Sequence, residues 1–420
     1  MPYIDLLHPS EAVSIWYTSS SRLGTVNSLL PDKPTIVMLH PLYLNSSWLW
    51  CQMDDPRLNS SYNIIAFDTR TSGKSMSTPS GMYDTWVQAA DLALCFQYLH
   101  LPPVHLVGIE TVSVSCAQRF AILFPDMVLS LTLINVPPPT ELKTNLYMLD
   151  ELIQLYSYAE DLDTYEHAAK ELSTFFAGPG CEGDLLDDLI GFWEQSYPPS
   201  RRSLTMQNLN LIKNASFLPR LLFRTPLPRR MLEAINSPVL IIQSESSQIY
   251  PLEHAQALAD NFKSAGKDAR LFVVKGIAGY LTIMNPSIVN QTLLKFLGRL
   301  PRVRSDIKPP SVPVAQRMRE ALDTLAELTG DPSFSEKDAM CSLNFSCVSP
   351  EICKIQVKSR ESYAKDAAQA FSPLQPNGRP IRKYSEGRKD HWFVSESNGL
   401  SYAGKFLLPT LRGTLLGLHE

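Results

Sequence analysis

Short apolar runs alternate along the first 300 residues with longer segments in which apolar side chains recur every three or four positions. The short runs are typical of strands buried on both faces of a sheet, and the longer period is typical of helices. The predicted strands are 13–17, 35–39, 62–67, 104–109, 129–134, 239–242 and 270–274. The helices predicted between them include 83–101, 112–124, 252–262 and 287–300. This alternation predicts an α/β fold with a mainly parallel, doubly wound sheet.

Strands disappear from the pattern between residues 137 and 236. Amphipathic segments separated by glycine and proline take their place, at 141–158, 162–177, 185–193 and 204–212. A run of helices between two strands of one sheet is typical of an insertion. We therefore predict a helical cap over 137–236 that divides the core into residues 1–136 and 237–300.

The chain changes character again beyond residue 300. Several prolines between 301 and 313 indicate a linker, and 315–328 has the spacing of one amphipathic helix, so 301–330 is predicted as linker and helix. From 331 to 420 no periodicity continues, and proline, serine and charged residues are frequent. This composition predicts an irregular C-terminal extension.

Composition adds few constraints. A chain of 420 residues with 44% hydrophobic and 19% charged residues is ordinary for a soluble protein with a large core. Residues 301–420 carry 17 Lys and Arg against 14 Asp and Glu, an excess too small to indicate nucleic-acid binding. No stretch approaches the roughly 20 apolar residues of a membrane span, and the N-terminus lacks a signal-peptide pattern. We predict a cytoplasmic protein without a membrane span.

The seven cysteines do not indicate a metal site. Cys341, Cys347 and Cys353 are regularly spaced, with five residues in each interval. Close zinc ligands are usually separated by about two to four residues, and no histidine lies nearby to complete a site. We expect neither a metal nor another cofactor.

Four segments resemble motifs of the capped α/β-hydrolase family. Gly108-Ile109-Glu110-Thr111-Val112, between a predicted strand and a predicted helix, stands where that family has the G-x-S-x-G nucleophile elbow. The other three are His40-Pro41-Leu42, similar to its oxyanion loop, Asp68 to Ser75, similar to its D-x-R-G-x-G-x-S turn, and Gly276 to Gly279, similar to the turn before its last helix. The resemblance covers residues 1–300 and implies the fold predicted above.

The same resemblance implies a Ser, Asp and His triad, but all three positions differ here. Glu110 stands at the nucleophile position, Ser247 at the acid position and Tyr280 at the base position. A serine hydrolase needs an imidazole that takes the proton of the nucleophile, and no histidine lies near Tyr280 in the sequence. We therefore expect no ordinary esterase activity.

Two backbone amides form the oxyanion hole in this family, and the resemblance assigns them to Leu42 and Thr111. Pro41 replaces a glycine without removing the Leu42 amide, and His40 and Pro41 are candidates for lining a pocket. Val112 replaces the second glycine of the elbow, where close packing usually excludes a Cβ. We therefore predict that the strained turn has relaxed.

Two functions remain open for Glu110. In the first, its carboxylate accepts hydrogen bonds from the Leu42 and Thr111 amides at a helix N-terminus and fills the oxyanion hole. The protein is then a pseudoenzyme that binds a small apolar molecule or, through its C-terminal extension, a protein partner. In the second, Glu110 acts with Tyr280 as an atypical hydrolase or lyase on an ester, epoxide or similar small substrate.

Overall fold

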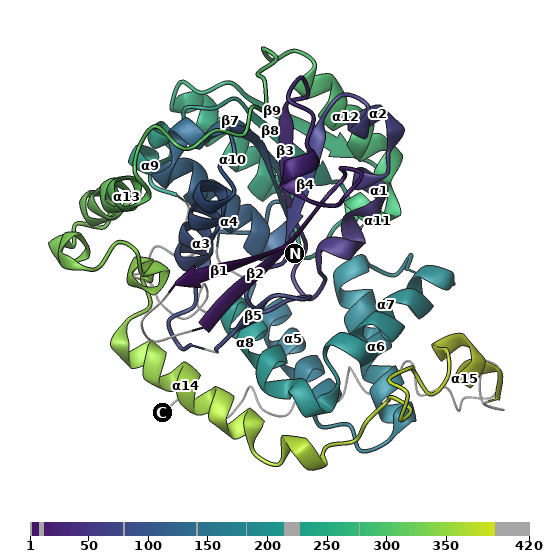
Figure 1. Cartoon of the computed structure of the whole chain (residues 1–420). Helices are drawn as coiled ribbons and strands as arrows, with labels where there is room; N and C mark the ends of the chain where they lie inside the picture. Colours follow the sequence, from purple (N-terminus) through teal and green to yellow (C-terminus); the bar gives the residue numbers. More distant parts are fainter. Residues whose placement is uncertain are drawn as a thin grey trace.

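The computed structural model describes residues 2–7, 12–78, 80–139, 142–181, 183–213, 227–276 and 278–390, so residues 391–420 of the predicted extension lie outside it. In this part of the chain nine strands form one sheet, in the order β1-β2-β4-β3-β6-β7-β8-β9 with β5 paired to β2 (Figure 1). The strands are β1 (Tyr3–Leu7), β2 (Ala12–Ser19), β3 (Thr35–Leu39), β4 (Asn63–Phe67), β5 (Met76–Ser77), β6 (Val104–Ile109), β7 (Val128–Ile134), β8 (Val239–Ser244) and β9 (Ala269–Val274).

The sheet is parallel from β4 to β9, and β1, β2 and β5 add an antiparallel edge. The predicted α/β class is therefore confirmed. The short strands β1 and β5 were not predicted. In β1 Ile4 and Leu6 are buried and Asp5 between them is exposed, so the alternation is too short to stand out in the sequence.

Helices cover both faces of the sheet (Figure 1). Successive residues of β3 serve opposite faces: Val37 and Leu39 join one apolar cluster, and Ile36 and Met38 join another. Helices α3 (Thr85–Tyr98), α4 (Glu110–Leu123), α9 (Arg229–Ala234) and α10 (Leu252–Ser264) pack in the first cluster. Helices α1 (Trp50–Met53), α2 (Pro56–Asn59), α11 (Leu281–Met284) and α12 (Pro286–Leu297) pack in the second.

Four consecutive α-helices follow β7, ahead of α9 and β8, where the sequence predicted an inserted cap. They are α5 (Lys143–Ser157), α6 (Leu162–Ala177), α7 (Asp184–Ser196) and α8 (Arg202–Lys213), and we call them the insertion. Their apolar sides form a third cluster with residues that follow the sheet strands, among them Tyr43, Val112 and Tyr280. The insertion therefore covers the end of the sheet at which β6 runs into α4.

Helix α13 (Val314–Thr329) lies close to its predicted range and packs on the core, with Leu322 and Leu325 fully buried. Residues 331–390, called the extension below, were predicted to be irregular, but more than half of them lie in helices, among them α14 (Pro350–Ala364) and the short α15 (Tyr384–Asp390). Helix α14 was not predicted because it has no apolar side: Gln356 is its only buried residue. The described residues contain no helix of the length and apolar content that crossing a bilayer requires.

Short 3-10 helices complete the described structure. They are η1 (Val26–Ser28), η2 (Ser46–Leu49), η3 (Pro125–Met127), η4 (Pro199–Arg201), η5 (Pro332–Glu336), η6 (Ser342–Phe345) and η7 (Ala367–Gln369).

Candidate functional site

The elbow, residues Gly108 to Val112, keeps its strained turn. Glu110 begins α4 directly after β6 and has a φ of 61°, so the prediction of a relaxed turn was wrong. Strand β6 and helix α4 approach each other most closely at Gly108. A Cβ there would lie 2.5 Å from the carbonyl oxygen of Ser113. The Val112 side chain instead packs into the cluster of the insertion. A β-branched residue at that position therefore does not prevent the turn.

Backbone strain is concentrated at this end of the sheet. Tyr43 follows β3, Glu110 follows β6, Asn135 follows β7 and Tyr280 precedes α11, with φ values of 61°, 61°, 54° and 40°. Each such conformation costs about 1–3 kcal/mol in a residue with a side chain and persists only where the surroundings enforce it. Ligands of open α/β sheets bind at the carboxyl ends of the strands. This end of the sheet is therefore the candidate functional site.

The Glu110 carboxyl is buried, with 2% of the residue exposed. Nδ2 of Asn135 donates to its Oε1 over 3.3 Å, the Tyr250 hydroxyl donates to its Oε2 over 3.3 Å, and the backbone N–H of Tyr280 is a third donor. Burial raises the pKa of Glu110 to about 8, and the three hydrogen bonds only partly oppose this shift. The carboxyl is therefore mainly protonated near neutral pH, which makes it a weak nucleophile.

The predicted contacts of Glu110 with the amides of Leu42 and Thr111 do not form. The carboxyl instead points toward the loops after β7 and β8 and the backbone before α11, because its partners come from those segments. Thr111 contributes through its hydroxyl, which lies 3.0 Å from the Tyr250 hydroxyl. The side chains of Glu110 and Thr111 are thus linked through the hydroxyl of Tyr250.

Tyr280 lies beside Glu110, but its hydroxyl does not bond to the carboxyl. The side chain is fully buried, and its hydroxyl has no hydrogen-bond partner. Burial raises the pKa of this phenol well above its usual value of 10. The ring stacks on that of Phe176, with centroids 6.3 Å apart. Tyr280 therefore serves as a packing residue on the side of the insertion.

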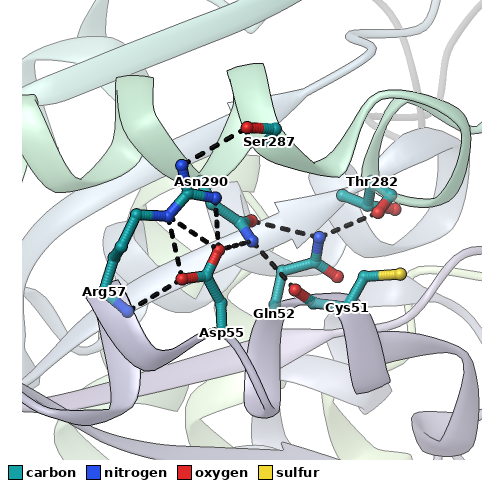
Figure 2. A network of polar contacts seen from close by, with 7 residues as sticks. All are labelled: Cys51, Gln52, Asp55, Arg57, Thr282, Ser287 and Asn290. Atoms are coloured by element: carbon teal, nitrogen blue, oxygen red, sulfur yellow. Dashed lines mark hydrogen bonds and ion pairs between the residues drawn. The ribbon is translucent and has the colours of Figure 1, made fainter.

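A polar network holds the helix that follows Tyr280 (Figure 2). Nε2 of Gln52 donates to the carbonyl of Thr282 over 2.8 Å and to Oδ1 of Asn290 over 3.2 Å. Nδ2 of Asn290 donates to Oδ2 of Asp55 over 2.8 Å, and Arg57 pairs with the same carboxylate. These contacts fix α11 against α1, α2 and α12 and thereby fix the backbone of Tyr280.

Ser247, at the predicted acid position, shapes the turn after β8. Its residue is 8% exposed, and its Oγ accepts from the backbone N–H of Tyr250 over 3.1 Å. This bond places Tyr250, whose hydroxyl in turn reaches Glu110. Ser247 therefore acts on the elbow only through another residue.

His40 is bonded at both ring nitrogens. The Thr69 backbone N–H lies 3.3 Å from Nε2, and this group can only donate, so Nε2 accepts and Nδ1–H donates to the Pro41 carbonyl over 2.8 Å. The Ser72 hydroxyl lies 2.8 Å from the same Nε2. Burial lowers the pKa of His40, in agreement with a neutral ring. This imidazole braces a loop and has no free nitrogen for proton transfer.

Aromatic side chains fill the space between the elbow and the insertion. The Tyr43 ring lies 5.7 Å from those of Phe176 and Tyr197, and Trp193 lies 6.4 Å from Phe176, measured between centroids. The cavity that they leave measures about 10 Å³, at the lower limit for one water molecule. We call these four residues the aromatic plug. The plug is therefore packed with almost no free volume between its rings.

The backbone also closes this space. A Cβ at Gly279 would lie 2.0 Å from the carbonyl oxygen of Phe176, so the end of α6 rests directly on the residue before Tyr280. A Cβ at Gly178 would lie 2.4 Å from that of Ala278. Only glycine allows such approaches. The insertion is therefore packed onto the core without a gap at this point.

An open cleft of about 580 Å³ lies to one side of the plug, between α5, α6 and the loops after β8 and β9. Ser247 is the only predicted site residue in its lining; Glu110, Tyr280, His40 and Pro41 do not take part. The lining residues are Asn145, Met148, Leu152, Glu171, Thr174, Phe175, Phe176, Ala177, Gly178, Pro179, Gly180, Ser246, Ser247, Gln248, Ile249, Gly276, Ala278 and Met284.

The sequence analysis missed most of these residues and two partners of Glu110. Met148 and Phe175 have the spacing of ordinary core positions on amphipathic helices, so nothing distinguishes them in the sequence. Asn135 carries a weak signal, because asparagine directly after a strand tolerates a positive φ. Among the described residues no group of His, Cys, Asp or Glu side chains is arranged to hold a metal ion.

The model of the alpha/beta hydrolase fold matches residues 34–276, more than half of the chain. The chain belongs to the alpha/beta hydrolase fold family. No curated protein matches it.

Solved structures of this family are similar in fold. A thermophilic esterase from Thermogutta terrifontis is 14% identical, with a TM-score of 0.54 over 71% of this chain and 99% of that one. A hydrolase from Pseudomonas aeruginosa PA01 is 17% identical, with a TM-score of 0.54 over 70% of this chain and 98% of that one. A bromoperoxidase from Bacillus anthracis is 18% identical, with a TM-score of 0.54 over 70% and 99%. At these identities the likeness extends to the fold alone.

Proposed function

We propose that this protein has no serine-hydrolase activity and that it binds a small, largely apolar molecule in the cleft beside the insertion. The observation that carries the proposal is the environment of Glu110. Its buried carboxyl, at the elbow position, is occupied by three donors from its own chain and does not line the cleft. The site of chemistry expected for the fold is thus sealed, and the open site lies elsewhere.

Acyl transfer requires a nucleophile in contact with both a base and the substrate. Glu110 contacts an amide side chain and a phenol, and the neutral His40 uses both nitrogens in its loop. The aromatic plug packs against Tyr280 through Phe176 and leaves almost no free volume between its rings. Each of these features opposes hydrolysis independently.

The alternative, acid–base chemistry by Glu110 and Tyr280, requires their side chains to act on one molecule. The Tyr280 hydroxyl bonds to nothing, and both side chains are buried. The two residues meet through the Tyr280 backbone N–H. No contact in the structure favours this second function.

The cleft indicates the class of ligand. Met148, Leu152, Phe175, Ile249 and Met284 provide an apolar wall, and its volume lies within the usual range of about 300–1,000 Å³ for small-molecule sites. Thr174 and Gln248 offer hydrogen bonds, and Glu171 is the only charged residue in the lining. A carboxylate in the lining disfavours anions. We therefore propose a neutral or cationic ligand with an apolar body.

Titration with N-phenyl-1-naphthylamine, a neutral apolar fluorophore, tests this site. Met148→Asp places a charge in the apolar wall of the cleft, and we expect it to weaken binding of the fluorophore at least about tenfold. Leu155→Asp is the matched control, because Leu155 lies on the same helix, is 52% exposed and is outside the lining. Equal affinities of the wild type and the Met148→Asp variant would refute the assignment of the cleft.

A further inference from the structure

The extension is attached to the core at one end. Its Phe345 is fully buried in the core cluster. The backbone N–H of Cys347 donates to Oδ2 of Asp84 over 2.9 Å, and Arg70 donates to the Ser342 hydroxyl over 2.7 Å. This end is therefore part of the folded core. Beyond it the chain passes under the insertion as α14 and reaches α6 and α7 at α15 (Figure 1).

The other end is held on the insertion by polar contacts. Nε and Nη2 of Arg382 donate to the two carboxylate oxygens of Glu166 over 3.1 and 3.0 Å, and Nη2 also donates to Asp163 over 2.5 Å. Three residues on, the backbone N–H and hydroxyl of Ser385 donate to the two oxygens of Asp187 over 3.0 and 2.6 Å. Both carboxylates, Glu166 and Asp187, are thus engaged through two oxygens, which gives the contact directional specificity.

Charge and shape on the two sides are complementary. Helices α6 and α7 contain seven Asp and Glu residues and one Lys, whereas residues 379–387 contain three Arg and Lys residues and one Glu. The Pro380 ring lies over Gly191 of α7, at 3.9 Å from the position a Cβ would take there. Glu194, 1% exposed, lies close by, but burial and the charge of Glu166 raise its pKa to about 8, so the negative charge of the surface comes from Asp163, Glu166 and Asp187. Without a cation from outside the helices, this surface has an uncompensated negative charge.

We propose that the surface formed by Asp163, Glu166, Asp187 and Gly191 is a docking site for a basic peptide segment of a partner protein. The recognised pattern is an arginine followed three positions later by a residue with a hydroxyl group. Residues 380–387 occupy this site in cis, and the partner segment takes their place when it binds.

Exchange is feasible because the two ends of the extension differ. The Arg382 side chain is 26% exposed, and its partners Asp163 and Glu166 are 60% and 6% exposed, so solvent and competing ions reach the contact with Asp163 directly, whereas that with Glu166 is shielded. The Lys365 carbonyl is still held by Arg202, but the segment from Asp366 to Arg382 contains only turns, η7 and an isolated bridge, so it can move away while the core end stays in place. A tethered segment acts at a high effective concentration, so a partner must compete with the bound residues 380–387. When the contacts of these residues with the surface are weakened, the partner binds more tightly.

The full-length chain with Arg382→Ala and Ser385→Ala tests the proposal. A fluorescein-labelled peptide with the sequence of residues 376–390 is titrated in trans, and binding is followed by fluorescence anisotropy. We expect this double variant to bind the peptide at least about tenfold more tightly than the wild type, because the cis competitor is removed. Adding Asp187→Asn to the double variant is expected to weaken binding about tenfold or more.

A peptide carrying the same two alanines is the matched control and is expected not to bind. Equal binding of the native peptide to the wild type and the double variant, or no binding to the double variant, would overturn the proposal. A second measurement does not depend on the peptide: trypsin cleavage after Lys383 should be faster in Asp187→Asn than in the wild type. An unchanged cleavage rate would show that this contact does not hold the segment. A dimer formed by exchange between copies, detected by gel filtration, would assign the site to a second copy and overturn the choice of partner.

Discussion

Glu110 and Asn135 follow neighbouring parallel strands, each with a positive φ, and their side chains meet over 3.3 Å. The contact joins two strained positions at the end of the sheet where ligands of such folds bind. Because the carboxyl is turned toward Asn135 and Tyr250, it closes the elbow from within. The central feature of this site is a strained backbone at the elbow whose carboxyl group, on Glu110, is not free to react.

Glu110→Gln is expected to change how stability depends on pH. The pKa of this carboxyl is raised from an ordinary value of 4.5 to about 8. Between these values the unfolded chain releases the proton and the folded chain keeps it, so the free energy of unfolding of the wild type falls as pH rises, by up to about 1.4 kcal/mol per pH unit. Glutamine does not titrate, so the variant lacks this loss.

Urea unfolding at several pH values between about 5 and 8 measures this effect. The stability of Glu110→Gln relative to the wild type should rise steadily across the range. Glu245→Gln is the control, because Glu245 is exposed and follows β8 nearby. Parallel profiles for the wild type and Glu110→Gln would contradict the buried, protonated state of Glu110.

Asn135→Ala should destabilise the protein by about 2–4 kcal/mol. It removes the donor to Glu110 and the acceptor of the Ser244 backbone N–H, and it places an alanine at a φ of 54°. Asn135→Gly loses the same hydrogen bonds but tolerates the backbone, so it should cost about 1 kcal/mol less. Chemical unfolding of both variants checks this order, and an alanine variant as stable as the glycine variant would show that the backbone at this position is not strained.

Phe176→Ala tests the aromatic plug. Phe176 is 5% exposed and contacts Tyr43, Trp193 and Tyr280. Its truncation should cost about 3–5 kcal/mol and leave a cavity that binds a small apolar molecule such as benzene. Thermal unfolding with and without benzene measures both effects. Phe175→Ala, at a half-buried position, should cost clearly less; equal losses would contradict the special role of Phe176.

The buried ion pair of Arg70 and Asp91 should contribute strongly to stability. Its atoms are 2.6 Å apart, and the two side chains are 2% and 7% exposed. Asp91→Asn removes the carboxylate that pairs with the buried guanidinium, which should cost about 3–5 kcal/mol in urea unfolding. At the exposed pair of Arg229 and Glu233, whose side chains are 74% and 47% exposed, Glu233→Gln should cost less than about 1 kcal/mol. Similar losses in the two variants would contradict this difference.

The fold was largely predictable from the sequence. Its strands bury every residue of an apolar run, and its helices bury one complete apolar side, so both leave a clear periodic pattern. The strand 104–109 is an example: all six residues are buried, and the sequence indicated a buried strand that runs into the elbow at Gly108. Asp84 also caps α3, accepting from the backbone N–H groups of Trp86 and Val87. Such local rules carry over directly from sequence to structure.

The site was less predictable, because it depends on which way single side chains point. From the sequence, Glu110 was placed at the elbow, but its carboxyl was expected to accept hydrogen bonds from the amides of Leu42 and Thr111. The actual partners, Asn135 and Tyr250, come from loops after other strands, and pairing across 25 and 140 positions leaves no local pattern. Helix α14 was missed for a related reason: it packs along α8, and only a few partly buried residues such as Ile352 and Cys353 touch the core, so it shows no apolar stripe.

Hydrolysis of p-nitrophenyl butyrate by the full-length wild type and by Glu110→Gln tests the central claim most directly. With the carboxyl held by Asn135, Tyr250 and the Tyr280 backbone, both proteins should hydrolyse the ester no faster than buffer alone. Turnover by the wild type that is lost in Glu110→Gln would contradict a sealed elbow and show that Glu110 performs catalysis.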